Sequence, residues 1–532
     1  MSETPVFSTA AVAAPHPAVA ETGLTILAAG GNAVEAAVAM AASAAAVRPR
    51  AAGLGGDGFW LVREPGGKVY ALDASGPAGS QATIRRCRDK GFEAPPLEGP
   101  EACLTVAGAV GGWILALELA RALGGRLPLD LLLGDAIRLA RQGSGPVEPA
   151  VSAPGTGAPR PVPQAAEGAL PVPAAPGAAP EAPPLSPMLA DTLGQLAHAG
   201  LGDFYRGDVG REIAADLERL GSPVLRRDLE GHRARAVEPL AIRLRAATLF
   251  APPPPSQGLA VLLAAGILDR MAVRRTEGAD LQHALIEAVK RAYAVRDRVV
   301  ADPWEVPQDP VSFFRAGWLE REAAAAAADR AGAFATPVPP QGRSLWIGCV
   351  DRDGLAVSCT HGLGPEGGSR SLLPATGILW HARGMGFSLD PGGWNPLEPG
   401  RRPFHALAPV LAAFDGGRVL AFGAGGAEEP QVEAQLFARH AQAGLSLAEA
   451  LEAPRWALLP GEGGGPGILR IEAGFDPSLA RELDRRGHRV EEEESGEVAG
   501  AFGEAGMLVK SPGDGRVAGA WDPRSGGAVL GL

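Results

Sequence analysis

The sequence predicts a large protein of mixed α and β structure, because helical and strand-like patterns recur along all 532 residues. Hydrophobic residues make up 46% of the chain and charged residues 20%, which is enough apolar material for a large buried core. A helix of small residues is predicted at Ala33–Val47, where Asn32 and Glu35 form a capping-box pattern at its start. A second helix is predicted at Leu281–Arg298, whose apolar residues recur on one face.

Short apolar runs bounded by turn residues predict strands between these helices. Phe59–Val62 and Val69–Leu72 are expected to pair through the turn at Gly66-Gly67. Leu345–Val350 and Leu355–Thr360 are expected to form a β-hairpin. Further strands are predicted at Ala247–Phe250, Gly377–Trp380, Arg418–Phe422 and Leu469–Ile471.

Two helices are predicted in the last third of the chain. A glycine-rich loop, Gly423–Gly426, is expected to lead into a helix that begins near Pro430. Ser446 and Glu449 form a capping-box pair, which predicts a short helix that ends before Pro454.

Proline marks two segments of different character. Residues 146–187 contain 13 prolines among 42 residues, interleaved with Ala and Gly, so this tract is predicted to be a disordered or polyproline insertion. Pro252–Pro255 lies between apolar runs and is predicted to be an ordered, rigid connection.

Charge and targeting patterns narrow the class of protein. The net charge is −11 without any Lys/Arg run, which argues against nucleic acid or an anionic membrane surface as a partner. Met1–Pro15 has no secretory pattern, and Ala33–Val47 is too short to span a bilayer, so the cytoplasm is the expected location. The four cysteines are expected to be buried and reduced, with two disulfides as the alternative: Cys87, Cys103, Cys349 and Cys359.

Most chemical motifs that could define a function are absent. No GxxxxGK[ST] loop occurs, and Glu428 and Glu429 follow the Gly423–Gly426 run where a phosphate would need positive charge. The nine histidines show no metal-ligand spacing, and no Gly-x-Ser-x-Gly elbow is present. We therefore expect no metal and no cofactor.

One serine lies at an unusual place. Ser344 follows the loop Gln341-Gly342-Arg343 and opens the strand Leu345–Val350. If the chain were cut before Ser344, its own α-amine would act as general base for its hydroxyl. Spacing alone favours an ordinary serine at the start of a strand.

Ordered motifs over nearly the whole chain change this balance. They are Ala29-Gly30-Gly31-Asn32-Ala33, Gly53-Leu54-Gly55-Gly56-Asp57-Gly58, Pro253-Pro254-Pro255-Ser256-Gln257-Gly258, His283–Arg298, Val350-Asp351, Gly400-Arg401-Arg402-Pro403, Glu452-Ala453-Pro454-Arg455-Trp456 and Asp522-Pro523-Arg524-Ser525. Together these motifs resemble the γ-glutamyltranspeptidase family of N-terminal-nucleophile hydrolases. The tract at 146–187 lies outside the resemblance.

The resemblance implies a four-layer αββα sandwich and a precursor that cuts itself. The family's new N-terminal residue is a threonine before Val-Asp, and counting back from Val350-Asp351 places it at Ser344. Residues 1–343 would form a large subunit and 344–532 a small subunit, both in one shared core. The family's oxyanion pair corresponds to Gly425-Gly426, with Gly426-Ala427 as the ungapped alternative.

The substrate pocket departs from the glutathione-cleaving members. Ser75 stands where they carry the arginine that pairs with the substrate α-carboxylate. His405-Ala406 replaces their Ser-Ser pair, and Met385-Gly386 replaces their acidic pair. Ser75, His405 and Arg383 are therefore the predicted substrate-binding residues, with Arg383 as the substitute cation. Thr360 and His361 also lie in a divergent stretch, and we interpret them as structural.

The divergent motifs are similar to those of family members known as oxamate amidohydrolases or unassigned γ-glutamyltransferase-like proteins. The sequence therefore predicts an amidohydrolase acting through an acyl-enzyme on a small acidic amide, oxamate-like or γ-glutamyl-like. Two alternatives remain: an unprocessed family member serving as a scaffold or binding protein, and a true γ-glutamyl transferase or glutathione hydrolase.

Overall fold

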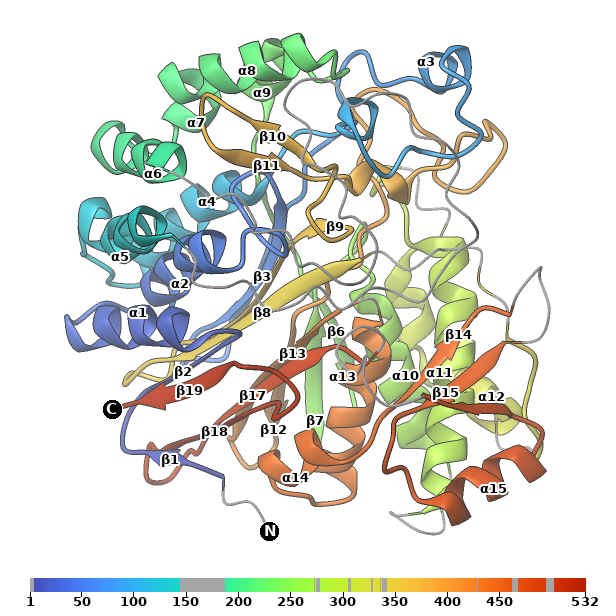
Figure 1. Ribbon diagram of the computed structural model, residues 1–532. Coiled ribbons are helices and arrows are strands. Elements are labelled where there is room, and N and C mark those ends of the chain that lie inside the picture. Colours follow the sequence, from blue (N-terminus) through green and yellow to red (C-terminus); the bar gives the residue numbers. More distant parts are fainter. Residues whose placement is uncertain are drawn as a thin grey trace.

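Two seven-stranded antiparallel sheets form the centre of the molecule in the computed structural model (Figure 1). The structure describes residues 4–143, 187–271, 273, 278–304, 308–326, 329–334, 336, 342–426, 428–461, 467–493 and 502–532. The predicted insertion at 146–187 lies outside the described residues, apart from Pro187.

The sheet that carries Ser344 has the strand order β19-β2-β8-β9-β3-β4-β5. Its strands are β2 (Ala11–Ala14), β3 (Asp57–Arg63), β4 (Val69–Ala74), β5 (Arg235–Val237), β8 (Arg343–Val350), β9 (Ala356–Gly364) and β19 (Ala528–Gly531). The predicted pairing of β3 with β4 and the β8–β9 hairpin are both confirmed. Strand β9 continues to Gly364, four residues beyond the predicted end.

The second sheet has the order β1-β18-β17-β13-β12-β7-β6. Its strands are β1 (Val6–Phe7), β6 (Leu240–Arg243), β7 (Ala247–Ala251), β12 (Val410–Phe414), β13 (Val419–Gly425), β17 (Glu504–Lys510) and β18 (Val517–Trp521). Two small sheets lie outside the sandwich. They are β10 (Ser371–Leu373) with β11 (Ile378–Trp380), and β14 (Trp456–Leu459) with β15 (Ile468–Ile471) and β16 (Arg489–Glu492).

The inner faces of the two large sheets pack against each other. Leu61 and Trp346 from one sheet share an apolar cluster with Leu411 and Leu508 from the other. Face-to-face packing of this kind buries one side of each sheet and leaves the other side to be covered by helices.

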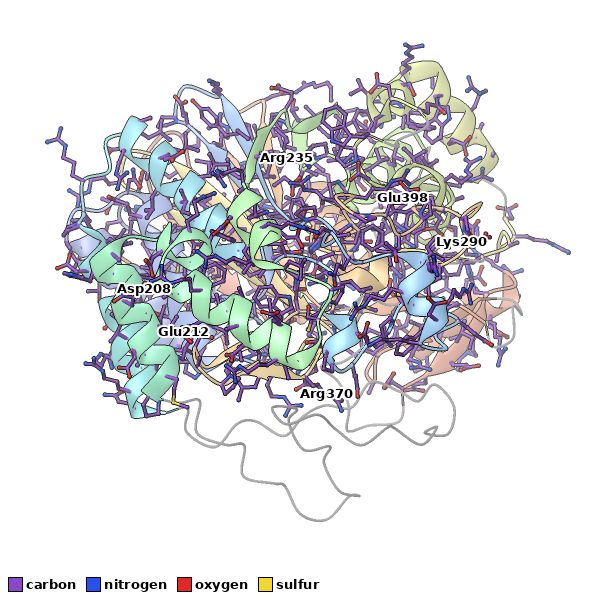
Figure 2. The ribbon with its side chains drawn as sticks, turned by 90° about the horizontal axis from the view of Figure 1, so that it is seen from above. Asp208, Glu212, Arg235, Lys290, Arg370 and Glu398 are labelled. Carbon is purple, nitrogen blue, oxygen red and sulfur yellow. The ribbon has the colours of Figure 1, made fainter. Side chains whose placement is uncertain are left out.

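Helices cover both outer faces, which confirms the predicted four-layer αββα sandwich. One layer contains α1 (Pro17–Ala28), α2 (Ala33–Val47), α4 (Ala109–Ala122), α5 (Leu129–Gln142), α6 (Pro187–Ala199) and α8 (Asp208–Leu220). The other contains α10 (Gly258–Arg270), α11 (Ala279–Val299), α12 (Ala316–Ala326), α13 (Glu429–Phe437) and α14 (Leu447–Glu452). In Figure 2, Asp208 and Glu212 of α8 lie at one side of the molecule and Lys290 of α11 lies at the other.

The remaining helices are short or peripheral. They are α3 (Ile84–Asp89), α7 (Asp203–Arg206), α9 (Arg226–Gly231) and α15 (Pro477–Arg485). The predicted capping boxes are confirmed at the first turns of α2 and α14. In each, the side chain of the cap residue accepts the backbone N–H of the glutamate three positions later, and the carboxylate of that glutamate accepts the backbone N–H of the cap residue.

The predicted loop at Gly423–Gly426 is wrong in part, because Gly423, Ala424 and Gly425 belong to β13. The glycine at 423 serves close packing: a Cβ there would lie 2.1 Å from Cδ1 of Trp346. The strand therefore continues to the edge of the site before α13 begins.

Strands from both sides of residue 343 alternate in each large sheet. β8 and β9 lie between β2 and β3 in one sheet, and β12, β13, β17 and β18 lie between β7 and β1 in the other. A cut before Ser344 would thus leave two chains interleaved in both sheets.

The four cysteines are all buried and free. Within the described ranges, no helix combines the length and the apolar character needed to cross a bilayer.

Candidate active site

Ser344 is the second residue of β8, one position inside the strand that it was expected to open. The pairing of β8 with β9 is irregular between Arg343 and Leu345, so the strand bulges at Ser344. Its side chain is buried, with 3% of the residue exposed. Arg343, on the other side of the peptide bond, is half-buried.

The hydroxyl of Ser344 has two partners. It donates a hydrogen bond to Oε1 of Glu429, in the first turn of α13, and it accepts one from the backbone N–H of Gly426 at 3.1 Å. The other carboxylate oxygen of Glu429 accepts the N–H of Ala408 at 3.1 Å. The hydroxyl is thus held between a carboxylate and a backbone donor.

The predicted oxyanion pair lies beside Ser344. Gly425 ends β13, and a Cβ at this position would lie 2.3 Å from the carbonyl oxygen of Ser344. Gly426 has φ +146°, which side chains disfavour, and its N–H faces Ser344 Oγ. Both positions therefore favour glycine.

Arg383 places a buried cation near the peptide bond between Arg343 and Ser344. It begins a short 3-10 helix (Arg383–Gly386) and is 1% exposed. A Cβ at Gly362 would lie 2.4 Å from Nη2 of Arg383 and 3.0 Å from the carbonyl oxygen of Arg343. Burial lowers the pKa of Arg383 to about 10, while Asp57 and Glu429 oppose this, so the guanidinium stays charged at neutral pH.

His405 belongs to a buried group centred on Asp57. Its Nε2 lies 3.0 Å from Oδ2 of Asp57, and Nδ1 of His381 lies 3.5 Å from the same oxygen. Burial lowers the pKa of His405 to about 4, with Arg383 acting in the same direction, so His405 is neutral at pH 7. The pKa of Asp57 lies well below its usual range, because His381 and His405 outweigh the effect of burial.

The carboxylate of Asp57 has further support. Its Oδ1 accepts the backbone N–H groups of Gly76 at 3.2 Å and Gly108 at 2.9 Å. Asp57 is thereby an anionic centre that fixes the ring of His405. Its charge raises the pKa of Arg383, and the charge of Arg383 in turn lowers the pKa of His405.

Ser75 follows β4 and is fully buried. Its hydroxyl and its N–H both donate to Oδ1 of Asp73, and its carbonyl accepts Nε of Arg402 at 3.2 Å. Oδ2 of Asp73 also pairs with Arg235 at 2.6 Å. Ser75 is thus anchored to an acid–arginine network, whereas Arg383 lies near the peptide bond between Arg343 and Ser344.

Three residues of this site were not singled out by the sequence reasoning: Glu429, Asp57 and His381. Glu429 was noted only as a charge that opposes phosphate. Asp57 lies inside the family motif Gly55-Gly56-Asp57-Gly58, and an acidic residue between glycines is the sequence signal that could have identified it. Nothing local marks His381.

Thr360 and His361 lie in β9. The ring of His361 meets Trp60 edge to face at 5.2 Å between centroids, on the side of the strand that faces the helices of the α2 layer. This contact supports the structural interpretation of His361.

One set of described residues has metal-like geometry. Ligand atoms of His283, Glu287 and His488 lie within 4.8 Å of one another. However, Nζ of Lys290 lies 2.7 Å from Glu287 and 3.5 Å from Nδ1 of His488, so an ammonium group already serves as the cation there. We interpret the cluster as a polar link between α11 and the segment at His488.

Known proteins resemble this chain over nearly its whole length. The family model described as gamma-glutamyltranspeptidase matches residues 19–532. The chain is 41% identical to an oxamate amidohydrolase proenzyme of Klebsiella pneumoniae, over 97% of each chain. It is 32% identical to a glutathione hydrolase-like proenzyme of Bacillus subtilis, over 98% of each. It also resembles the crystal structure of a cephalosporin acylase from Bacillus halodurans, with a TM-score of 0.84, 29% identity, and coverage of 100% of this chain and 97% of that one.

Proposed function

The chain belongs to the γ-glutamyltranspeptidase family of N-terminal-nucleophile hydrolases, and from this premise we propose that it is a self-processing amidohydrolase for a small acidic amide. Cleavage before Ser344 would give a large subunit of residues 1–343 and a small subunit of residues 344–532. The observation that carries the proposal is the placement of Ser344 Oγ between Gly426 and Glu429, with Arg383 beside the scissile bond.

The catalytic cycle follows from these positions. In the cut protein, the neutral α-amine of Ser344 takes the hydroxyl proton as Oγ attacks the amide carbon of the substrate. The N–H groups of Gly425 and Gly426 stabilise the oxyanion of the tetrahedral intermediate. The amine then gives the proton to the departing nitrogen, and water hydrolyses the remaining ester to release the acid and restore the hydroxyl.

The substrate class follows from the charge of the site. Arg383 is a buried cation near the nucleophile, so it can bind a carboxylate next to the reacting amide. Oxamate, the substrate named for the Klebsiella relative, has an amide and a carboxylate on adjacent carbons, and its hydrolysis yields oxalate and ammonia. We propose that His405 and Ser75 shape the substrate site from behind, His405 through its contact with Asp57 and Ser75 through its contact with Asp73.

The cytoplasm is the compartment that we propose for this enzyme. Its four thiols are free and buried, which suits a reducing environment.

The decisive experiment is an intact-mass measurement on the purified protein and on Ser344→Ala. The wild type should give two fragments that meet between Arg343 and Ser344, and the alanine variant one uncut chain without ammonia release from oxamate. Ser344→Thr should be cut and active, because threonine supplies the same hydroxyl. An alanine variant that still splits would refute the assignment and direct attention to Thr360.

A second experiment tests the carboxylate contact. Arg383→Ala should raise KM for oxamate by about 10- to 100-fold, since a hydrogen bond to a charged group contributes about 1.5–3 kcal/mol. Arg352→Ala, in the exposed β8–β9 turn, is the matched control and should leave KM unchanged. Faster turnover of γ-glutamyl p-nitroanilide than of oxamate would favour γ-glutamyl chemistry instead.

A further inference from the structure

The uncut chain lacks the base that the mature enzyme would use. Before cleavage, the nitrogen of Ser344 is part of the peptide bond to Arg343, and an amide nitrogen does not accept a proton at neutral pH. Self-cleavage nevertheless requires that the Ser344 hydroxyl lose its proton. The base for this first reaction must therefore be another group near Oγ.

Glu429 is the group in contact with that hydroxyl. Its Oε1 accepts the hydrogen bond from Ser344, and its Oε2 is fixed by the N–H of Ala408 at 3.1 Å. Glu429 is 1% exposed and Ser344 is 3% exposed, so this carboxylate rather than bulk solvent meets the hydroxyl.

The surroundings of the Arg343 carbonyl group also favour attack on it by Ser344 Oγ. The bulge between Arg343 and Leu345 interrupts the regular pairing of β8 at this bond. The carbonyl oxygen of Arg343 and the guanidinium of Arg383 both lie against Gly362, where only a residue without a side chain leaves room for them. A positive charge thus lies near the oxygen that becomes an oxyanion.

We propose, on the basis of the self-processing function above, that Glu429 is the general base of the cleavage before Ser344. Glu429 takes the proton from Oγ as Oγ attacks the carbonyl carbon of Arg343. The C–N bond then breaks, and Glu429 returns the proton to the nitrogen of Ser344, which becomes the α-amine. Water hydrolyses the new ester, leaving a carboxyl group on Arg343 and the free hydroxyl on Ser344.

The electrostatic surroundings suit this role. Burial raises the pKa of Glu429 to about 8, although the hydrogen bond from Ser344, the charge of Arg383 and the N–H of Ala408 act in the opposite direction. Glu433, one turn further along α13, has a pKa raised well above its usual range by burial and by Glu429. Glu433 is therefore protonated, and Glu429 is the member of the pair that titrates near neutral pH, where a general base is effective.

The test is the rate of precursor cleavage from pH 6 to pH 9 in the full chain, with Glu429→Gln as the variant. Wild-type cleavage should become about tenfold faster per pH unit as the carboxyl ionises and should level off above pH 8. Glu429→Gln keeps the side-chain shape but takes up no proton, so its cleavage should be at least about 100-fold slower and lose this rise with pH.

Two further variants make the result decisive. Glu433→Gln is the matched control, because it neutralises a carboxyl that is already protonated on the same helix, and it should keep the wild-type pH profile. Glu429→Asp, which retains a carboxylate at a longer distance, should cleave slowly but with the rise with pH intact, and it serves if the glutamine variant does not fold.

Wild-type rate and pH profile in folded Glu429→Gln would overturn the assignment of the base while leaving self-processing in place. Cleavage of Ser344→Ala would instead overturn the proposed function.

Discussion

Because His361 of β9 is buried, we expect acid to lower the free energy of unfolding by a defined amount. His361 is 4% exposed, and burial lowers the pKa of its ring to about 4 from an ordinary 6.5. A histidine whose folded pKa is depressed stabilises the fold fully above pH 6.5, and this contribution is lost as the pH falls toward 4. At about 1.36 kcal/mol per pKa unit, the complete loss is about 3.4 kcal/mol.

The perturbation is His361→Gln, which removes the titrating ring and keeps a polar side chain. Between pH 7.5 and pH 5, the free energy of unfolding of the parent should fall by about 2 kcal/mol more than that of the variant. Urea denaturation at the two pH values measures this difference. Both proteins should carry Ser344→Ala, so that each unfolds as one chain.

A matched control is His198→Gln on the exposed surface of α6, which should follow the parent at both pH values. Equal losses of stability in the parent and in His361→Gln, within about 0.5 kcal/mol, would refute the reasoning, because His361 would then accept a proton in the folded state at no cost. Any constant destabilisation by the glutamine cancels in the comparison.

Two further variants and one control, Asp415→Ala, test the packing around the site and the small-subunit region. Gly425→Ala should slow precursor cleavage and lower the melting temperature, since its Cβ would lie 2.3 Å from the carbonyl oxygen of Ser344; an unchanged rate would contradict this contact. Asp522→Ala should cost about 3–5 kcal/mol in urea denaturation, because it leaves the guanidinium of Arg455, 2.7 Å away in a fully buried pair, without its partner. Asp415→Ala breaks an exposed pair and should cost less than about 1 kcal/mol.

Local patterns predicted the elements whose causes are local. The capping box of α2 and the β8–β9 hairpin follow from residues a few positions apart, and the structure has both. The strand at Gly423–Gly425 was missed because the reason for its glycine at 423 lies far away in the sequence. Trp346 fills the space that a side chain at Gly423 would need.

The candidate site shows the same limit. Ser344 was singled out by counting back from the family motif Val350-Asp351, and Gly425-Gly426 by its correspondence to the family's oxyanion pair. The contact of Ser344 with Glu429 joins residues 85 positions apart, and that of His405 with Asp57 joins residues 348 apart. Contacts of this kind leave no periodic trace in one sequence, so only the folded chain brings them together.

The interior position of β8 changes what unfolding would mean for the protein after cleavage. With the chain cut before Ser344, each large sheet is shared by two molecules, so unfolding ends in separate chains and becomes dependent on protein concentration. The uncut precursor would refold by a first-order reaction, whereas the mature enzyme would need two partly folded chains to meet. At low concentration, heat damage to the mature form would then be permanent, and activity would return only with newly made precursor.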